Sequence, residues 1–132
     1  MFLSLVLLSI YISCVDWKYH RITNKSLLVA LAVFSCWSLA TRSDLRFSQT
    51  FLIALLALIG YKFGLGAGDV KLIALLSLFF FPRTPERLID LVEGFVATSM
   101  ALIIIDRFRG RSFADSIALA PAICAAFIWC AR

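Results

Sequence analysis

The sequence predicts an all-α, polytopic integral membrane protein with about six transmembrane helices, some of them short. Three observations support this prediction. Of the 132 residues, 62% are hydrophobic and 16% are charged, against about 45–50% and about 25% in soluble domains. The mean hydropathy of +0.96 leaves too little polar surface to cover a soluble globule of this size. The apolar residues are also gathered into six runs, separated by short polar loops.

The six runs mark the expected helices, and none of them alternates with period two as a barrel strand would. A helix needs about 20 residues to cross the hydrocarbon layer, so six full spans would need about 120 residues. Several spans should therefore be short or tilted, and a re-entrant helix is the alternative for the fourth run. A single membrane-embedded domain is expected over residues 1–132. The runs cover about residues 2–15, 26–40, 50–65, 70–82, 88–105 and 114–131.

The cations in the loops predict the orientation. If the amino terminus lies outside, eight of the 13 Lys and Arg residues face inward and five face outward, as the positive-inside rule requires. We therefore expect a multi-pass protein with both termini outside. The net charge of +5 comes from these loops, so no nucleic-acid-binding surface is expected. The inward group is Lys18, Arg21, Lys25, Lys62, Lys71, Arg107, Arg109 and Arg111.

No metal site or disulfide framework is predicted. The four cysteines lie inside apolar runs and form no CxxC pair or metal-type spacing. We interpret them as small buried hydrophobic residues. The lone His20 lies in a basic loop, where a solvated role is the simpler interpretation. The cysteines are Cys14, Cys36, Cys124 and Cys130.

Acidic residues at membrane depth are candidates for function, because a charge is costly there. Most of the eight acids have a structural explanation, either in a polar turn or beside a basic loop, where an ion pair or the helix dipole stabilises them. Glu93 is different, because it lies inside the fifth run and either snorkels outward or has a buried role. The acids with structural explanations are Asp44, Glu86 and Asp90 in turns, and Asp106 and Asp115 beside the loop.

Two further acids lie in more informative contexts. Asp16 closes the first apolar run, and Asp69 opens the fourth in the segment Gly64-Leu65-Gly66-Ala67-Gly68-Asp69. Because glycines propagate helices poorly, the chain should unwind just before Asp69. Non-helical backbone at that depth must lie against protein or a water-filled cavity. The predicted orientation places both aspartates at the cytoplasmic boundary of the membrane.

A pair of carboxyl groups in a wet cleft can hydrolyse peptide bonds. Mutual repulsion raises one pKa, so one carboxyl stays protonated while the other is ionised. The ionised group takes a proton from the attacking water, and the protonated group hydrogen-bonds the scissile carbonyl. No metal or cofactor is required. The pair titrates as a unit, so either aspartate can act as the base.

These segments resemble the type IV prepilin peptidase family. Gly66-Ala67-Gly68-Asp69 is similar to the family's GxGD signature, and Val70-Lys71-Leu72 extends the similarity. The stretch 16–24 is similar to its first-span motif, with Thr23 in place of the usual proline. We expect Thr23 to cap the second helix instead. The stretch 117–123 resembles the family's proline-containing last-span motif, with Ala118 in place of one proline.

The resemblance implies a membrane aspartyl endopeptidase of the inner, or cytoplasmic, membrane. It would remove the short basic leader of prepilins or pseudopilins at the cytoplasmic face, with Asp16 and Asp69 as catalytic residues. Around them we expect Lys71, Lys18 and Asn24 to bind substrate or to tune the pKa of the pair. Backbone flexibility at the site is assigned to Gly64, Gly66 and Gly68.

The same resemblance implies the partners and a limit on the activity. The paired CxxC motifs of larger bifunctional members do not occur in this sequence, which is similar to the short, peptidase-only form of tight-adherence (Flp-type) pilus systems. We therefore expect no methyltransferase activity. The expected partners are a prepilin or pseudopilin with a transmembrane helix, the lipid bilayer and other pilus-assembly proteins.

Two other functions stay open at this stage. Asp16, Asp69 and Glu93 would suit a membrane transport protein that handles protons or cations, although both motif acids lie near one membrane face and no inverted repeat is visible. A non-catalytic pilus-assembly subunit would retain pilin binding alone. The intact pair of aspartates argues against that second alternative.

Overall fold

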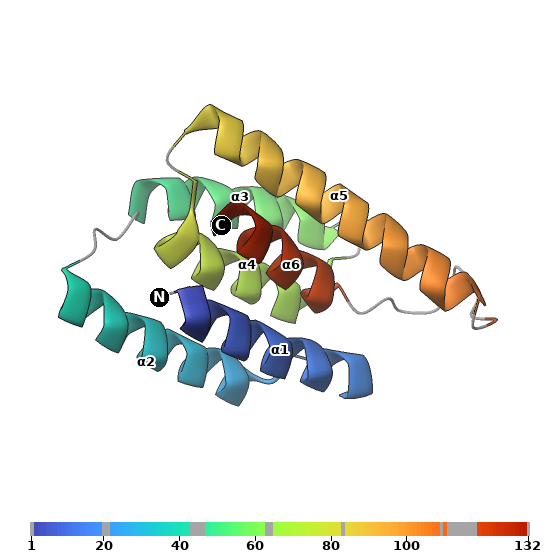
Figure 1. The fold of residues 1–132 in the computed structure, drawn as a ribbon, viewed down its shortest axis with the longest axis horizontal. Coiled ribbons are helices and arrows are strands. Elements are labelled where there is room, and N and C mark those ends of the chain that lie inside the picture. The colour runs from blue at the N-terminus through green and yellow to red at the C-terminus, as the bar shows by residue number, and fades with distance from the viewer. Residues whose placement is uncertain are drawn as a thin grey trace.

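The computed structural model describes residues 2–19, 22–42, 47–62, 65–82, 84–108, 110 and 119–131. Within these ranges the chain forms six α-helices and no strand, so the all-α prediction is confirmed. The helices run side by side, with α4 and α6 in the middle of the bundle (Figure 1). They are α1 (Phe2–Tyr19), α2 (Asn24–Thr41), α3 (Phe47–Lys62), α4 (Ala67–Phe80), α5 (Pro85–Phe108) and α6 (Ala120–Ala131).

The helices differ in length, as the limited number of residues requires. Three of them, α1, α2 and α5, are long and apolar enough to cross a membrane, and α3 and α6 are shorter apolar helices. At about 1.5 Å per residue, the 14 residues of α4 span about 21 Å. The prediction of a polytopic membrane protein with some short helices is therefore confirmed. Residues 114–118 of the last expected run lie outside the described residues.

Helix α6 forms the centre of the core. It contacts α1, α4 and α5, and Ala122, Ile123, Cys124, Ala126 and Phe127 are all buried. Small residues at such contacts let the helix backbones approach closely.

Glycine supports the same close packing on α5. A Cβ atom added at Gly94 would lie 3.4 Å from the Cα atom of Ala126, so this part of α5 lies directly against α6.

The α2–α4 side of the core is aromatic instead. The ring centroid of Phe34 lies 5.5 Å from that of Phe79 and 5.1 Å from that of Phe80.

The outer surface of the bundle is apolar. Phe51 on α3 is 74% exposed, and Ile89 and Met100 on α5 are more than half exposed. A soluble monomer rarely exposes so many large apolar side chains together, whereas lipid tails accept them without cost. This distribution is that of a membrane protein.

The cysteine prediction is half right. Cys124 and Cys130 are buried in α6, as expected, but Cys14 and Cys36 are exposed. Their helices α1 and α2 lie at the edge of the bundle, so a cysteine on their outer side contacts lipid and not protein. All four thiols are free.

Candidate active site

Asp16 lies in the last turn of α1 and is only 5% exposed. Its Oδ2 atom accepts a hydrogen bond of 3.2 Å from the backbone N–H of Ala120, the first residue of α6. The first N–H groups of a helix have no partner within it, and the positive end of the helix dipole favours an anion there. The start of α6 therefore holds this carboxyl group in place.

Asp69 is the third residue of α4. The preceding Gly66 caps the helix in an extended conformation, with φ −65° and ψ 143°. Its backbone also hydrogen-bonds the Asp69 carboxyl, as the third residue of a capping box does. A Cβ atom added at Gly66 would come within 2.9 Å of Asp69 Oδ2, so glycine leaves room for this reversed side chain.

The glycine segment differs from the expectation in two ways. The chain was expected to unwind just before Asp69, but α4 already begins at Ala67, so the non-helical backbone lies at Leu65 and Gly66. Gly68, to which backbone flexibility was assigned, has a packing contact in the structure. It lies within α4, where an added Cβ atom would be 2.9 Å from Ile22 Cβ, so the glycine allows close packing here. Gly64 lies outside the described residues.

Thr23 begins α2 as predicted. It adopts the extended backbone of a cap (φ −77°, ψ 143°), and its Oγ1 accepts a hydrogen bond of 3.2 Å from the backbone N–H of Ser26. The replacement of proline at this position is thus compatible with a well-formed helix start.

The two sequence motifs meet at this helix start. Lys71 Nζ donates a hydrogen bond of 2.9 Å to Oδ1 of Asn24, the first residue of α2. One turn earlier on α4, Gly68 meets Ile22. The segments 16–24 and 66–72 therefore form one structural unit, although they are separated in the sequence. Lys18 is exposed, and its ammonium lies 5.3 Å from the ring centroid of Tyr19.

The two carboxyl groups influence one another. Burial is the largest cause that raises the pKa of Asp69 from 3.8 to about 6, and the charge of Asp16 raises it further, against the hydrogen bond from Gly66. Asp69 lies in the first turn of α4, just before the apolar run that begins at residue 70. A pKa near 6 lets this pair hold one proton close to neutral pH.

The other acids lie elsewhere or outside the described residues. Glu93 is exposed on α5 and lines a shallow cavity with Trp129, nine residues along α6 from Ala120, or about 14 Å. Asp106 is buried in the last turn of α5. Glu86 and Asp90 belong to the start of α5 and not to a turn. Asp44, Asp115 and His20 lie outside the described ranges.

A sequence model of the type IV leader peptidase family matches residues 3–130. The chain belongs to this family. The match spans both aspartates and nearly the whole chain, so this leader peptidase is a membrane protein of the protease class. Comparisons with curated proteins and with solved structures found no match.

One residue of the candidate site is missed by sequence reasoning. The backbone of Ala120 holds Asp16, but an alanine has no side chain that points to chemistry. The available signal is Pro121, because proline is favoured in the first turn of a helix, where its missing N–H costs nothing. That signal locates the start of α6 but does not reveal what it binds.

Proposed function

We propose that this leader peptidase family member is an aspartic endopeptidase that removes the short basic leader of a prepilin or pseudopilin. One observation supports this most directly. Asp16, in the last turn of α1, lies close enough to Asp69, in the first turn of α4, for its charge to raise the pKa of Asp69. Both carboxyl groups lie at helix ends, where backbone N–H groups hold them.

The pair would carry out hydrolysis with one shared proton. The ionised carboxylate takes a proton from water while the water oxygen attacks the scissile carbonyl carbon. The protonated carboxyl donates a hydrogen bond to the carbonyl oxygen and stabilises its developing charge. The C–N bond then breaks, and the leaving amine takes up a proton from the pair. Each carboxyl group serves in turn as acid and base.

The proposed setting is the inner membrane, with the site toward the cytoplasm and both termini outside. The exposed cations Lys18, Lys25 and Lys71 border the helix ends that carry the aspartates. Such a rim attracts an acidic residue next to the cleaved bond. Lys71 and Asn24, which are already hydrogen-bonded to each other, would contact the substrate from one side. The further proposed partners are other pilus-assembly proteins, and methyltransferase activity is not part of the proposal.

Substitution of the two aspartates tests the proposal. The protein is co-expressed with a tagged prepilin, and the mass of the precursor is followed. We expect Asp16→Asn and Asp69→Asn each to slow leader removal by about 1,000-fold or more, as loss of a catalytic group does. Asp90→Asn is the matched control, because Asp90 lies on α5 away from the pair, and it should process normally.

The outcome separates the proposal from its alternatives. Loss of the leader in the wild type and in Asp90→Asn alone, with the cut at one bond, supports the peptidase. Normal processing by either active-site variant contradicts the two-aspartate mechanism. A full-length precursor in every sample of folded protein favours a proton- or cation-handling transport protein or a non-catalytic assembly subunit. Ion-flux measurements on the same variants distinguish these two.

A further inference from the structure

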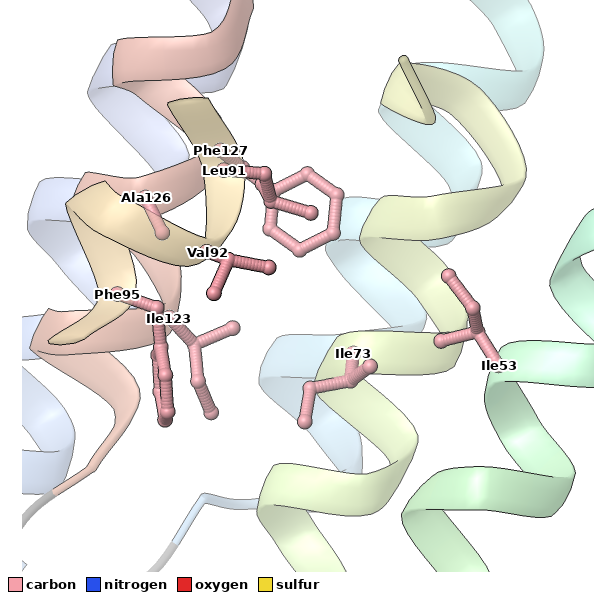
Figure 2. A pocket seen from close by; sticks show the side chains of 8 residues that line it. All are labelled: Ile53, Ile73, Leu91, Val92, Phe95, Ile123, Ala126 and Phe127. Atoms are coloured by element: carbon pink, nitrogen blue, oxygen red, sulfur yellow. The ribbon is translucent and has the colours of Figure 1, made fainter. Parts of the chain in front are cut away.

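An apolar pocket lies between two pairs of helices, α3 and α4 on one side and α5 and α6 on the other (Figure 2). Its volume is about 200 Å³, and every side chain that lines it is a hydrocarbon. Its chemistry therefore suits an apolar occupant and excludes a charged or polar one. The lining residues are Ile53, Ile73, Leu91, Val92, Phe95, Ile123, Ala126 and Phe127.

The pocket is a gap between helix pairs and not a hole inside a well-packed core. Among the described residues, α5 packs against α6, and α3 packs against α4, but α5 contacts neither α3 nor α4. Val92, on the α5 wall, is 55% exposed. The pocket is therefore accessible sideways from the lipid, between α3 and α5.

One end of the pocket adjoins the two aspartates. Ile73 lies four residues after Asp69 on α4, which is about 6 Å along the helix. Ile123 lies three residues after Ala120, whose N–H holds Asp16. In Figure 2 these two isoleucines lie on opposite walls of the pocket, both in its lower part. Its lower part thus lies about one helical turn from Asp69 on α4 and from Ala120 on α6.

We propose that this pocket binds an apolar side chain of the substrate's transmembrane helix, one to two turns beyond the scissile bond. The proposal rests on the proposed function, in which an apolar helix directly follows the cleaved bond. A cavity of about 150 Å³ holds a benzene molecule, so this pocket has room for one large aliphatic or aromatic side chain. When the substrate's apolar side chain occupies the pocket, the pocket's position relative to Asp69 and Ala120 would place the scissile bond at the carboxyl pair.

The short distance from the aspartates favours the substrate over two other apolar occupants. A lipid acyl chain or a helix from a second copy of the protein would fill the pocket equally well by apolar chemistry alone. Neither would need the pocket to begin one turn from the carboxyl pair. A substrate helix does need this, because its cleaved bond and its apolar segment are covalently adjacent.

Two valines one turn apart on α5 give a matched test. Val92 lines the pocket, whereas Val96 lies outside it, and they are 55% and 53% exposed. We expect Val92→Trp to fill the pocket and to raise KM for the full-length precursor about tenfold or more, the size of effect that follows when an apolar contact is blocked. Val96→Trp should leave KM unchanged, and kcat should change little in either variant.

Two further measurements identify the occupant. In the first, the bulky apolar side chains in the two turns after the cleaved bond of the precursor are replaced by alanine. With this altered precursor, the KM values of Val92→Trp and the wild type should become nearly equal. A photo-cross-linking amino acid at position 92, but not at position 96, should attach to the precursor's apolar segment.

The results distinguish failure of this inference from failure of the proposed function. If the wild type leaves the precursor uncut, the proposed function is wrong and the inference falls with it. If the wild type cuts and the Val92 and Val96 variants behave alike, the inference alone is overturned. Cross-links from position 92 only to lipid or to a second copy of the protein also overturn it.

Discussion

Asp69 determines how the site responds to protons. Its pKa of about 6 has two causes, burial as the larger and the charge of Asp16 as the smaller. The two causes can be separated, because a substitution at position 16 removes the charge and leaves the burial. This is useful for mechanism, since a shared proton requires the two carboxyl groups to interact.

We expect Asp16→Asn to lower the pKa of Asp69 from about 6 without returning it to 3.8, because burial remains. Carbon-13 NMR of the labelled Asp69 carboxyl measures this directly. In the wild type, the rate of cleavage should fall as the pH rises above about 6 and the pair loses its shared proton. An Asp69 pKa that is the same in Asp16→Asn as in the wild type would show that the two groups do not interact.

The stability of the folded protein should also depend on pH through Asp69. Because the pKa of Asp69 is higher in the folded protein than in the unfolded chain, its contribution to stability is full below 3.8 and is lost as the pH rises through about 6. The group is partly exposed, so solvent screening reduces the size of the effect.

At the scale of the helices, the candidate site depends on how closely α4 approaches the segment that leads into α2. Gly68 is the contact point, since an added Cβ atom would lie 2.9 Å from Ile22 Cβ. The Cβ atom of Ile22 is fixed to the backbone and cannot move aside by a change of rotamer. Relief therefore requires that the backbone of α4 or of the segment before α2 shifts.

We expect Gly68→Ala to move α4 away from the segment before α2, at a cost of about 1–3 kcal/mol for overpacking, and to reduce peptidase activity strongly. The control is Gly60→Ala on α3, where the added atom would lie 3.2 Å from the flexible end of Leu65. That variant should gain up to about 1 kcal/mol from helix propensity and retain activity. Thermal unfolding and cleavage rates of both variants test this, and equal activity in the two would contradict the packing role of Gly68.

At the scale of the whole molecule, the two shortest described helices, α4 and α6, are the ones that carry or hold the aspartates. Both α4 and α6 begin beside the aspartates, and their 14 and 12 residues span only about 21 Å and 18 Å. The hydrocarbon layer is about 30 Å thick, whereas the 24 residues of α5 cross it with room to tilt. The bilayer must therefore become thinner around α4 and α6, or the mismatch in length costs free energy.

Cleavage should therefore depend on bilayer thickness. We expect a lower rate in bilayers of long-chain lipids than of short-chain lipids, because a thicker layer covers the carboxyl pair and keeps water from it. The rate is measured on the reconstituted protein with one precursor in lipids of graded chain length. Circular dichroism in each lipid controls for folding. A rate that is constant or rises with thickness would contradict this prediction.

The sequence predicts much of this molecule, because its strongest signals are local. The helices follow from the apolar runs, and the cap at Thr23 follows from its hydroxyl group and its place before an apolar run. Asp16 and Asp69 were singled out among the eight acids by the segments around them, which resemble the motifs of a known family. The contacts of Ala120 and Gly68 were not predicted, since each depends on how distant helices meet. The pocket was not predicted for the same reason, as its lining comes from four helices.

The hydrogen bond between Asp16 and Ala120 joins residues 104 positions apart. One member of the carboxyl pair is therefore without this backbone partner until α6 has been synthesised, inserted and placed between α1 and α5. During biosynthesis the first four helices can assemble around both aspartates and still lack it. Under the proposed function, the order of translation thus delays the completed site, and a partly made chain would not yet hold the arrangement that cuts its neighbours in the membrane.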